Sequence, residues 1–317
     1  GATAIRVLLD RPLDAAVAPL VVASEQTAAV ENLSIALIAG PAPATAGDIF
    51  SRLAAGEADM ALADINALVR YRDRPDAARL QAVYMLTNAA AYAIVARRSR
   101  GIRTLADLAG KTLGFVDNDM AIAFWPALAR DNGLAADKVG LQRIGAAVRE
   151  PMLSAGQLDA VTGLSYLAPI NLKDRGIPGN DLTVLRYADH GSAAYGLAII
   201  VNPAFAAAQP DAVRGFVRAL NDALRLTVSD PAAALTRVLA AMTNGARDTE
   251  LERLNDIIRN NIVTAEVHRD GAGGIDPERF ATAIDQLAEG IKLRAKPAPG
   301  DIFDASFLPP REDRKLD

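Results

Sequence analysis

Two carboxylates and an amide stand together where a predicted strand gives way to a predicted helix. The apolar run TLGFV at 112–116 is followed by Asp117, Asn118 and Asp119, and a helix-like stretch begins near Met120. Ligands of α/β proteins are commonly held at such turns. Because this turn carries its own carboxylates, it would disfavour a bare anion and suit a solute with N–H donors or positive charge. The same residues could instead cap the helix, and the two roles are compatible.

A second group of candidate ligand contacts follows the first and third predicted strands. Arg11 and Asp14 come just after the run AIRVLL, and Asp64 ends the run MALAD. Because the carboxyl ends of parallel strands line the ligand crevice of an open α/β sheet, we predict that these side chains contact the ligand. Arg11 could clamp a ligand carboxylate in bidentate fashion. Two alternatives stay open: Arg11 could pair with Asp10 or Asp14, and Asp64 could cap the next helix.

Further candidates lie in two extended connecting segments and in the turns between them. The first connecting segment holds Asn88 and Tyr92, a strand-to-helix turn holds Ser165 and Tyr166, and the return segment is preceded by Asp189 and His190 and contains Tyr195. We predict that all seven contact the ligand. For His190, the alternative is a place in an exposed loop.

The composition argues against catalysis. The chain has no cysteine, which excludes a cysteine nucleophile, a thiolate zinc site and a disulfide. Its two histidines have no recognisable nucleophile nearby, and the sequence lacks a nucleophile elbow, a Walker loop and a dinucleotide-binding glycine motif. His268 stands between Glu266 and Asp270, but a single histidine makes a poor zinc site, so we expect a solvated face there. We predict no catalytic residue, no metal and no cofactor.

Charge and hydropathy narrow the class further. The formal net charge is −4 and the two signs are interspersed, so no large basic field exists to attract nucleic acid. No run of about 18 apolar residues could span a membrane. The chain opens with a strand rather than a signal peptide, so we expect either an intracellular protein or a mature form whose signal was removed.

The elements that position these residues form two α/β lobes. Four predicted strands, at 4–9, within the run LSIALIAG at 33–40, at 60–64 and at 80–86, alternate with helical stretches, which is typical of a mainly parallel sheet. The run AAYAIVARR then follows with almost no room for a helix, and a smaller α/β unit is rebuilt after it. The run AYGLAIIVN leads back, and amphipathic helices follow up to the polar ending PPREDRKLD, which we expect to be loose.

This order predicts one discontinuous lobe and one inserted lobe. The first comprises residues 1–93 and 197–317, and the second comprises residues 94–196. The two extended segments would join the lobes as a double-crossover hinge, so that a ligand-binding cleft could open and close.

Four motifs in this order give the chain a family resemblance. They are GEADMALAD, GIRTLADLAGKTLGF, GQLDAVTG and YGLAIIVNPAFAAAQPDAVRGFVRALNDALRLTVSDPAAAL. With them the chain resembles type 2 periplasmic substrate-binding proteins of ABC transporters, in the nitrate/sulfonate/taurine and NMT1/THI5-like (pyrimidine precursor) branch. The resemblance implies the two-lobed Venus-flytrap fold, a periplasmic location, and delivery of a small-molecule solute to the membrane permease subunits of an importer by a monomeric receptor.

The chain departs from that family at two points. Pyrimidine-binding members tend to open with a strand ending in Leu-Asp-Trp followed shortly by Asn, whereas Arg11 stands here in place of Trp and Asp14 about in place of Asn. This difference weakens the case for a pyrimidine ligand. Enzymes of the same branch rely on cysteines, which this chain lacks.

We therefore expect a receptor that binds a small polar organic solute, one that contains nitrogen, without transforming it. Three alternatives remain. The chain could be a THI5-like or lyase-type enzyme of the same fold, a receptor for a sulfonate- or nitrate-type anion, or the effector-sensing domain of a regulator.

Overall fold

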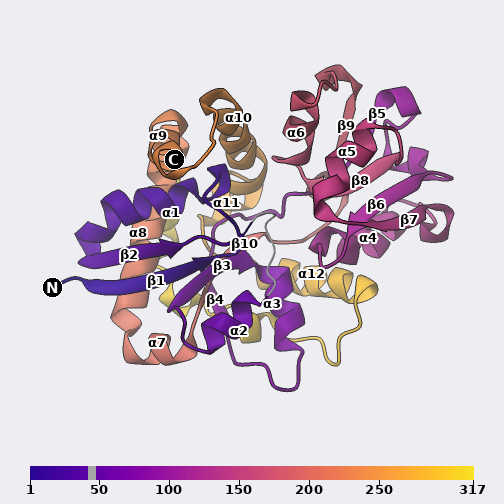
Figure 1. Ribbon diagram of the computed structural model, residues 1–317. Helices are drawn as coiled ribbons and strands as arrows, with labels where there is room; N and C mark the ends of the chain where they lie inside the picture. Colours follow the sequence, from indigo (N-terminus) through magenta and orange to yellow (C-terminus); the bar gives the residue numbers. More distant parts are fainter. Residues whose placement is uncertain (42–47) are drawn as a thin grey trace. The chain divides into compact units, whose positions relative to one another are not determined.

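The computed structural model describes residues 1–41 and 48–317, which divide into two compact units (Figure 1). Unit 1 comprises Gly1–Ala89, Tyr195–Ala281 and Pro297–Asp317. Unit 2 comprises Ala90–Ala194 and Thr282–Lys296. Each unit is built on its own five-stranded sheet, so each has its own core.

The sheet of unit 1 is mixed. Its strand order is β2 (Leu33–Ile38), β1 (Thr3–Leu9), β3 (Met60–Asp64), β10 (Leu197–Val201) and β4 (Gln81–Met85). Strand β1 runs parallel to β2 and β3, whereas β10 runs antiparallel to both of its neighbours. Strand β10 is apolar throughout, and Met60–Ala63 of β3 are fully buried, as expected for strands covered on both faces.

Helices surround this sheet, and the longest is amphipathic. They are α1 (Ala18–Val22), α2 (Ile49–Ala54), α3 (Ile65–Arg72), α7 (Pro203–Ala208), α8 (Pro210–Ser229), α9 (Pro231–Ala241), α10 (Arg247–Ile257), α11 (Ala265–Asp270) and α13 (Pro299–Ile302), with shorter turns η1 (Ala15–Val17), η2 (Ala23–Thr27), η3 (Ala28–Glu31) and η10 (Ile258–Ile262). Helix α8 packs its apolar stripe, including Phe216 and Leu220, against α1, η2 and η3. The Thr27 hydroxyl donates to the Ala219 carbonyl at 2.6 Å and fixes this contact.

Unit 2 repeats the same strand plan. Its order is β7 (Gly140–Ile144), β6 (Thr112–Val116), β8 (Ala160–Leu164), β5 (Tyr92–Arg97) and β9 (Leu182–Arg186). Strand β6 runs parallel to β7 and β8, and β5, the incoming crossover strand, is antiparallel to its neighbours. Helices α4 (Met120–Asp131), α5 (Arg149–Ser154) and α6 (Ala168–Asp174) pack on it. The predicted α/β class and the two extended crossover runs are therefore confirmed.

Two sequence motifs serve the same structural purpose in the two units. Asp59 accepts a hydrogen bond from the Arg6 amide at 2.8 Å, and Asp159 accepts one from the Thr112 amide at 2.9 Å. Each aspartate follows a helix that ends at a left-handed glycine, Gly56 in unit 1 and Gly156 in unit 2. The Gly-x-x-Asp pieces thus end a helix and join the next strand to its parallel neighbour, β1 in unit 1 and β6 (Thr112–Val116) in unit 2.

The division into units differs from the predicted lobes by a few residues at the two crossovers, where 90–93 group with unit 2 and 195–196 with unit 1, and in one longer segment. Residues 282–296 group with unit 2, whereas the sequence placed all of 197–317 in the first lobe. The Gln286 side chain accepts from the Ala193 amide at 2.9 Å and donates to the Gly191 carbonyl at 3.0 Å, and Glu289 pairs with Arg130. Helix α12 (Pro277–Gly290) therefore begins in unit 1 and ends in unit 2.

The expectation of a loose polar ending is wrong. The Arg314 guanidinium donates to the carbonyls of Ala272 and Pro309, both at 2.9 Å. Arg225 of α8 donates to the carbonyls of Asp313 and Lys315 at 2.8 and 3.0 Å. The guanidinium groups of Arg225 and Arg314 hold the C-terminal segment in place by binding backbone carbonyls. The polar composition of the segment therefore did not imply disorder.

The close approach of Gly273 to Tyr84 gives a test of the fold. Gly273 has a φ of +89°, and a Cβ there would lie 2.2 Å from Tyr84 Cε1. Gly273→Ala should lower the free energy of unfolding by about 2–5 kcal/mol, since it combines backbone strain with overpacking. Gly56→Ala, with a φ of +80° and nothing within 4 Å of the added carbon, should lose only about 1–2 kcal/mol. Equal losses in chemical denaturation would contradict this packing.

Candidate functional site

The strand ends of unit 1 bring several predicted residues to one edge of the sheet. Leu9 of β1 lies opposite Leu62 of β3, and Asp64 lies opposite Leu197 of β10. The Ile65 amide donates to the Gly196 carbonyl at 3.0 Å. The turns that carry Arg11, Asp14, Asp64, Asn88 and Tyr195 all leave or enter the sheet at this edge.

Asp64 caps the helix that follows it. Its Oδ1 accepts a hydrogen bond from the Asn66 amide at 2.7 Å, at the N-terminus of α3. The Asn66 side chain in turn donates to the Tyr195 carbonyl at 2.8 Å. The capping alternative is thus observed, and it anchors the start of α3 to the returning crossover segment.

Arg11 forms an ion pair with its neighbour Asp10. The side chains are 3% and 5% exposed, and Arg11 Nε lies 2.8 Å from Asp10 Oδ1. Arg11 Nη1 lies 4.0 Å from Asp14 Oδ2, while Asp14 Oδ1 accepts from the Ala16 amide at 3.0 Å and caps η1. Burial raises the pKa of Asp14, and the nearby Arg11 charge opposes that shift. Pairing with Asp10, one of the alternatives left open by the sequence, therefore occupies part of the Arg11 fork.

Asn88 and Tyr195 belong to a hydrogen-bonded network within unit 1. Asn88 Nδ2 and the Tyr195 hydroxyl both donate to Glu266 Oε2 at 2.7 Å. Asn88 Oδ1 accepts from Thr264 at 2.8 Å and from Arg279 at 2.9 Å. The Arg279 guanidinium also lies 3.7 Å from the centroid of the Tyr195 ring. These bonds tie the two crossover segments to α11 and α12.

The sequence did not indicate the carboxylate and the guanidinium of this network, Glu266 and Arg279. Glu266 was expected on a solvated face beside His268, yet its side chain is only 13% exposed and is shared by Asn88, Tyr195 and Arg279. Burial raises the pKa of Tyr195, with the Glu266 carboxylate adding to the shift. No local pattern marks Glu266 or Arg279, because their partners Asn88 and Tyr195 lie more than seventy residues away in the chain.

In unit 2 the turn at 117–119 is a helix cap with two ion pairs. Asp119 Oδ1 accepts from the Ala121 amide at 3.0 Å and starts α4, and its Oδ2 lies 3.4 Å from Arg149 Nη2. Asp117 is exposed and pairs with Arg143 at 3.0 Å. Asn118 has a φ of 64°, which asparagine tolerates well. Burial raises the pKa of Asp119, and Arg149 opposes the shift.

The remaining candidates of unit 2 follow β8 and β9 or begin β5, at the same sheet edge. Ser165 and Tyr166 are buried, and Ser165 Oγ has no hydrogen-bond partner among residues 1–41 and 48–317. Tyr92 is also buried, with its ring 5.6 Å from that of Phe124. Asp189 is exposed. His190 Nδ1 lies 2.7 Å from the Arg186 carbonyl, so the His190 ring is held locally.

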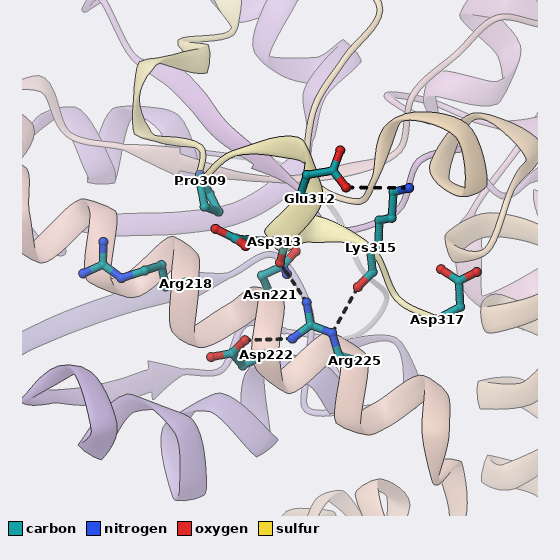
Figure 2. A pocket seen from close by; sticks show the side chains of 9 residues that line it. All are labelled: Arg218, Asn221, Asp222, Arg225, Pro309, Glu312, Asp313, Lys315 and Asp317. Atoms are coloured by element: carbon teal, nitrogen blue, oxygen red, sulfur yellow. Dashed lines mark hydrogen bonds and ion pairs between the residues drawn. The ribbon is translucent and has the colours of Figure 1, made fainter.

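A polar pocket that the sequence did not indicate lies between α8 and the C-terminal segment of unit 1 (Figure 2). Its volume is about 550 Å³, and it is lined by Arg218, Asn221, Asp222, Arg225, Pro309, Glu312, Asp313, Lys315 and Asp317. Arg225 lies 3.0 Å from Asp222, and Arg218 lies 2.9 Å from Glu31. Arg218 and Arg225 are thus already paired with carboxylates of the protein.

The acidic and histidine side chains and the helices of residues 1–41 and 48–317 bear on metal binding and on membrane insertion. No group of three or more acidic or histidine side chains there could hold a metal ion. Among the same residues, no helix combines the length and apolar character needed to cross a bilayer.

A family model described as NMT1/THI5 like matches residues 17–234. This match covers more than half of the chain. The chain belongs to the NMT1/THI5-like family. The family predicted from the four sequence motifs is thereby confirmed. No curated protein matches the chain in sequence.

Solved structures share the fold of this NMT1/THI5-like chain at low sequence identity. The periplasmic aliphatic sulphonate-binding protein SsuA from Escherichia coli is 16% identical, with a TM-score of 0.71 over 95% of this chain and 92% of that one. The periplasmic nitrate-binding protein NrtA from Synechocystis PCC 6803 is 11% identical, with a TM-score of 0.70 over 98% and 88%. The desulfurization enzyme DSZB is 12% identical, with a TM-score of 0.63 over 99% and 98%. The predicted periplasmic-binding-protein fold is confirmed, and it is one that both binding proteins and an enzyme use.

Substitutions at Asp64 can distinguish the stabilising effect of its capping hydrogen bond from that of its negative charge. Asp64→Ala should lower the free energy of unfolding of this NMT1/THI5-like protein by about 0.5–2 kcal/mol, because the Asn66 amide loses its acceptor. Asp64→Asn should retain most of that stability, since asparagine caps equally well. Chemical denaturation measures both. Asp117→Ala, at an exposed ion pair, should change stability by less than about 0.5 kcal/mol. A larger loss for Asp64→Asn than for Asp64→Ala would contradict the capping role.

Proposed function

We propose that this chain is the extracytoplasmic solute-binding receptor of an ABC importer. The observation that carries the proposal is the NMT1/THI5-like match over residues 17–234 on a fold that SsuA and NrtA share. Two sheets, each with a polar edge at its strand ends, suit such a role, because open α/β sheets bind ligands beyond the carboxyl ends of their strands. The predicted contact residues Arg11, Asp14 and Asp64 in unit 1 and the turn at 117–119 in unit 2 are the side chains we propose to test first.

The solute that we propose is small, polar and organic, and it contains nitrogen. The strand ends carry Asp14, Asp64 and Asp119, three carboxylates that accept hydrogen bonds. Arg11 is paired with Asp10 rather than standing apart as an anion clamp. Acceptor-rich edges favour a ligand with N–H donors or a positive charge over a bare anion. A sulfonate or nitrate, the ligands in the names of SsuA and NrtA, is the alternative.

We propose that the receptor binds its solute without catalysing a reaction. DSZB shows that an enzyme can use the fold, so the choice rests on this chain's own residues. A cysteine nucleophile is impossible because the sequence contains none. His190 is held by the Arg186 carbonyl, and its own carbonyl accepts from Asn132 at 2.9 Å. Turnover of a bound solute by purified protein would favour the enzyme instead.

The same proposal specifies partners and place. A receptor of this kind works outside the cytoplasm, in the periplasm, and delivers its solute to the membrane permease subunits of the importer. We propose that it acts as a monomer and needs neither a cofactor nor nucleic acid.

A thermal-shift screen over cationic, neutral and anionic small solutes tests the proposed function. A solute at 100 times its Kd should raise the free energy of unfolding by roughly 2.7 kcal/mol. We expect nitrogen-containing solutes to give the largest shifts. Stabilisation by sulfonates and nitrate alone would replace the proposed ligand class with the anionic one. A panel without any stabilising member would contradict the receptor role itself.

A further inference from the structure

Five charged side chains gather where β1 ends and α10 packs against η1. This β1-end cluster consists of Asp10, Arg11, Asp14, Glu250 and Arg253, and so holds three carboxylates and two guanidiniums. Arg11 pairs with Asp10 at 2.8 Å, and Arg253 pairs closely with Glu250. The approach of Arg11 Nη1 to Asp14 Oδ2 is longer, at 4.0 Å. Within these five residues, Asp14 is therefore the carboxylate in excess.

The cluster is buried, so its excess charge matters. Asp10, Arg11 and Glu250 are 3–5% exposed, whereas the Asp14 side chain is 20% exposed. Glu250 Oε2 is buried and accepts no hydrogen bond from any residue in 1–41 or 48–317. An uncompensated buried carboxylate is costly unless a proton or a cation neutralises it. The cluster thus calls for one more positive charge, and Asp14 is its most accessible member.

The surroundings of Asp14 favour its protonated form over the carboxylate. Burial raises the Asp14 pKa above its ordinary value of 3.8, Asp10 and Glu250 raise it further, and Arg11 lowers it. Helices α1, α9 and α10 pack against η1. Helix α1 carries no charge, and Arg237 of α9 points to Glu25, 3.5 Å away. The charges acting on Asp14 thus come from the end of β1 and from Glu250 of α10.

We propose that Asp14 is the acceptor for a cationic nitrogen of the solute, and that the solute displaces a proton from it. The inference rests on the proposed function and names its ligand class. Asp14 Oδ1 remains the cap of η1 through Ala16, and Oδ2 takes the N–H of the solute. The proton leaves to solvent, and the arriving ammonium supplies the missing positive charge. Affinity for such a solute rises with pH, because less proton remains to be displaced.

Matched pairs of probes test the ligand class by calorimetry. The pairs are taurine and isethionate, γ-aminobutyrate and γ-hydroxybutyrate, and putrescine and 1,4-butanediol, in which hydroxyl groups replace ammonium groups. We expect an amino member of at least one pair to bind the full chain, its hydroxyl partner to bind at least tenfold more weakly, and proton release to show as a dependence of binding heat on buffer.

Asp14→Asn removes the charge and retains a capping side chain. It should weaken binding of the amino probe roughly tenfold and abolish proton release. The control is Asp304→Asn, because Asp304 caps the short turn Ala305–Phe307 through the same type of bond, from the Ser306 amide at 2.9 Å. The control should bind like the wild type.

A second measurement needs no solute. An aspartate with a raised pKa in the folded state contributes stability that is present below the ordinary value of 3.8 and is lost as pH rises through the folded value. The wild type should therefore lose stability relative to Asp14→Asn as the pH rises above about 3.8. A constant difference between the two proteins would overturn the proton-linked part of the proposal.

The outcomes separate the two proposals. Binding of an amino probe that Asp14→Asn leaves intact, or equal binding of its hydroxyl partner, overturns the role of Asp14 and leaves the receptor function standing. Failure of every probe to bind the wild type overturns the proposed ligand class, and the receptor function then depends on the wider solute screen.

Discussion

The first N–H groups of a helix need acceptors, and this requirement shapes both candidate edges. Where a strand turns directly into a helix, the turn must supply the acceptor. Asp64 does so for α3, Asp119 for α4 and Asn202 for α7, each within one residue of the strand end or just before the first helical residue. Asp14 does the same for η1 after β1. Side chains that look like ligand contacts are therefore also the residues that fix the turns in place.

The repeated strand plan of the two units explains why the candidates fall into two similar groups. Each sheet contains one crossover strand, β10 in unit 1 and β5 in unit 2, that runs antiparallel to the strands on both of its sides. The crossover strand therefore begins at the sheet edge where its two neighbours end. The residues that lead into these strands, Tyr195 and Tyr92, therefore stand beside the carboxyl ends of β3 and β8. Chain order places them far from Asp64 and Ser165, and only the antiparallel pairing brings each tyrosine to its edge.

Local patterns in the sequence were sufficient for the strands, the caps and the family. Apolar runs ending in Asp or Asn predicted β3, β6 and β10, and the Gly-x-x-Asp pairs turned out to be one structural device used twice. The network around Glu266 was not predictable, because the bonds that tie Asn88 and Tyr195 into it join residues 71 to 191 positions apart. The grouping of residues 282–296 with unit 2 was missed for the same reason, since Gln286 finds its partners near residue 192. The C-terminal segment was misjudged because its composition is polar, while its order comes from backbone carbonyls bound by Arg225 and Arg314.

A choice between cap and ligand contact is therefore too narrow for these carboxylates. A carboxylate has two oxygens and about four lone-pair sites, and a helix cap uses one of them. In Asp14, Asp64 and Asp119 the capping atom is Oδ1 in every case. The second oxygen of Asp119 faces Arg149, which neutralises it, whereas that of Asp14 lies at the limit of ion pairing with Arg11. Capping fixes the orientation of each carboxylate but leaves its second oxygen able to accept further hydrogen bonds. The charge left on the second oxygen, rather than the presence of an acid at the turn, then decides which of these residues can recognise a cation.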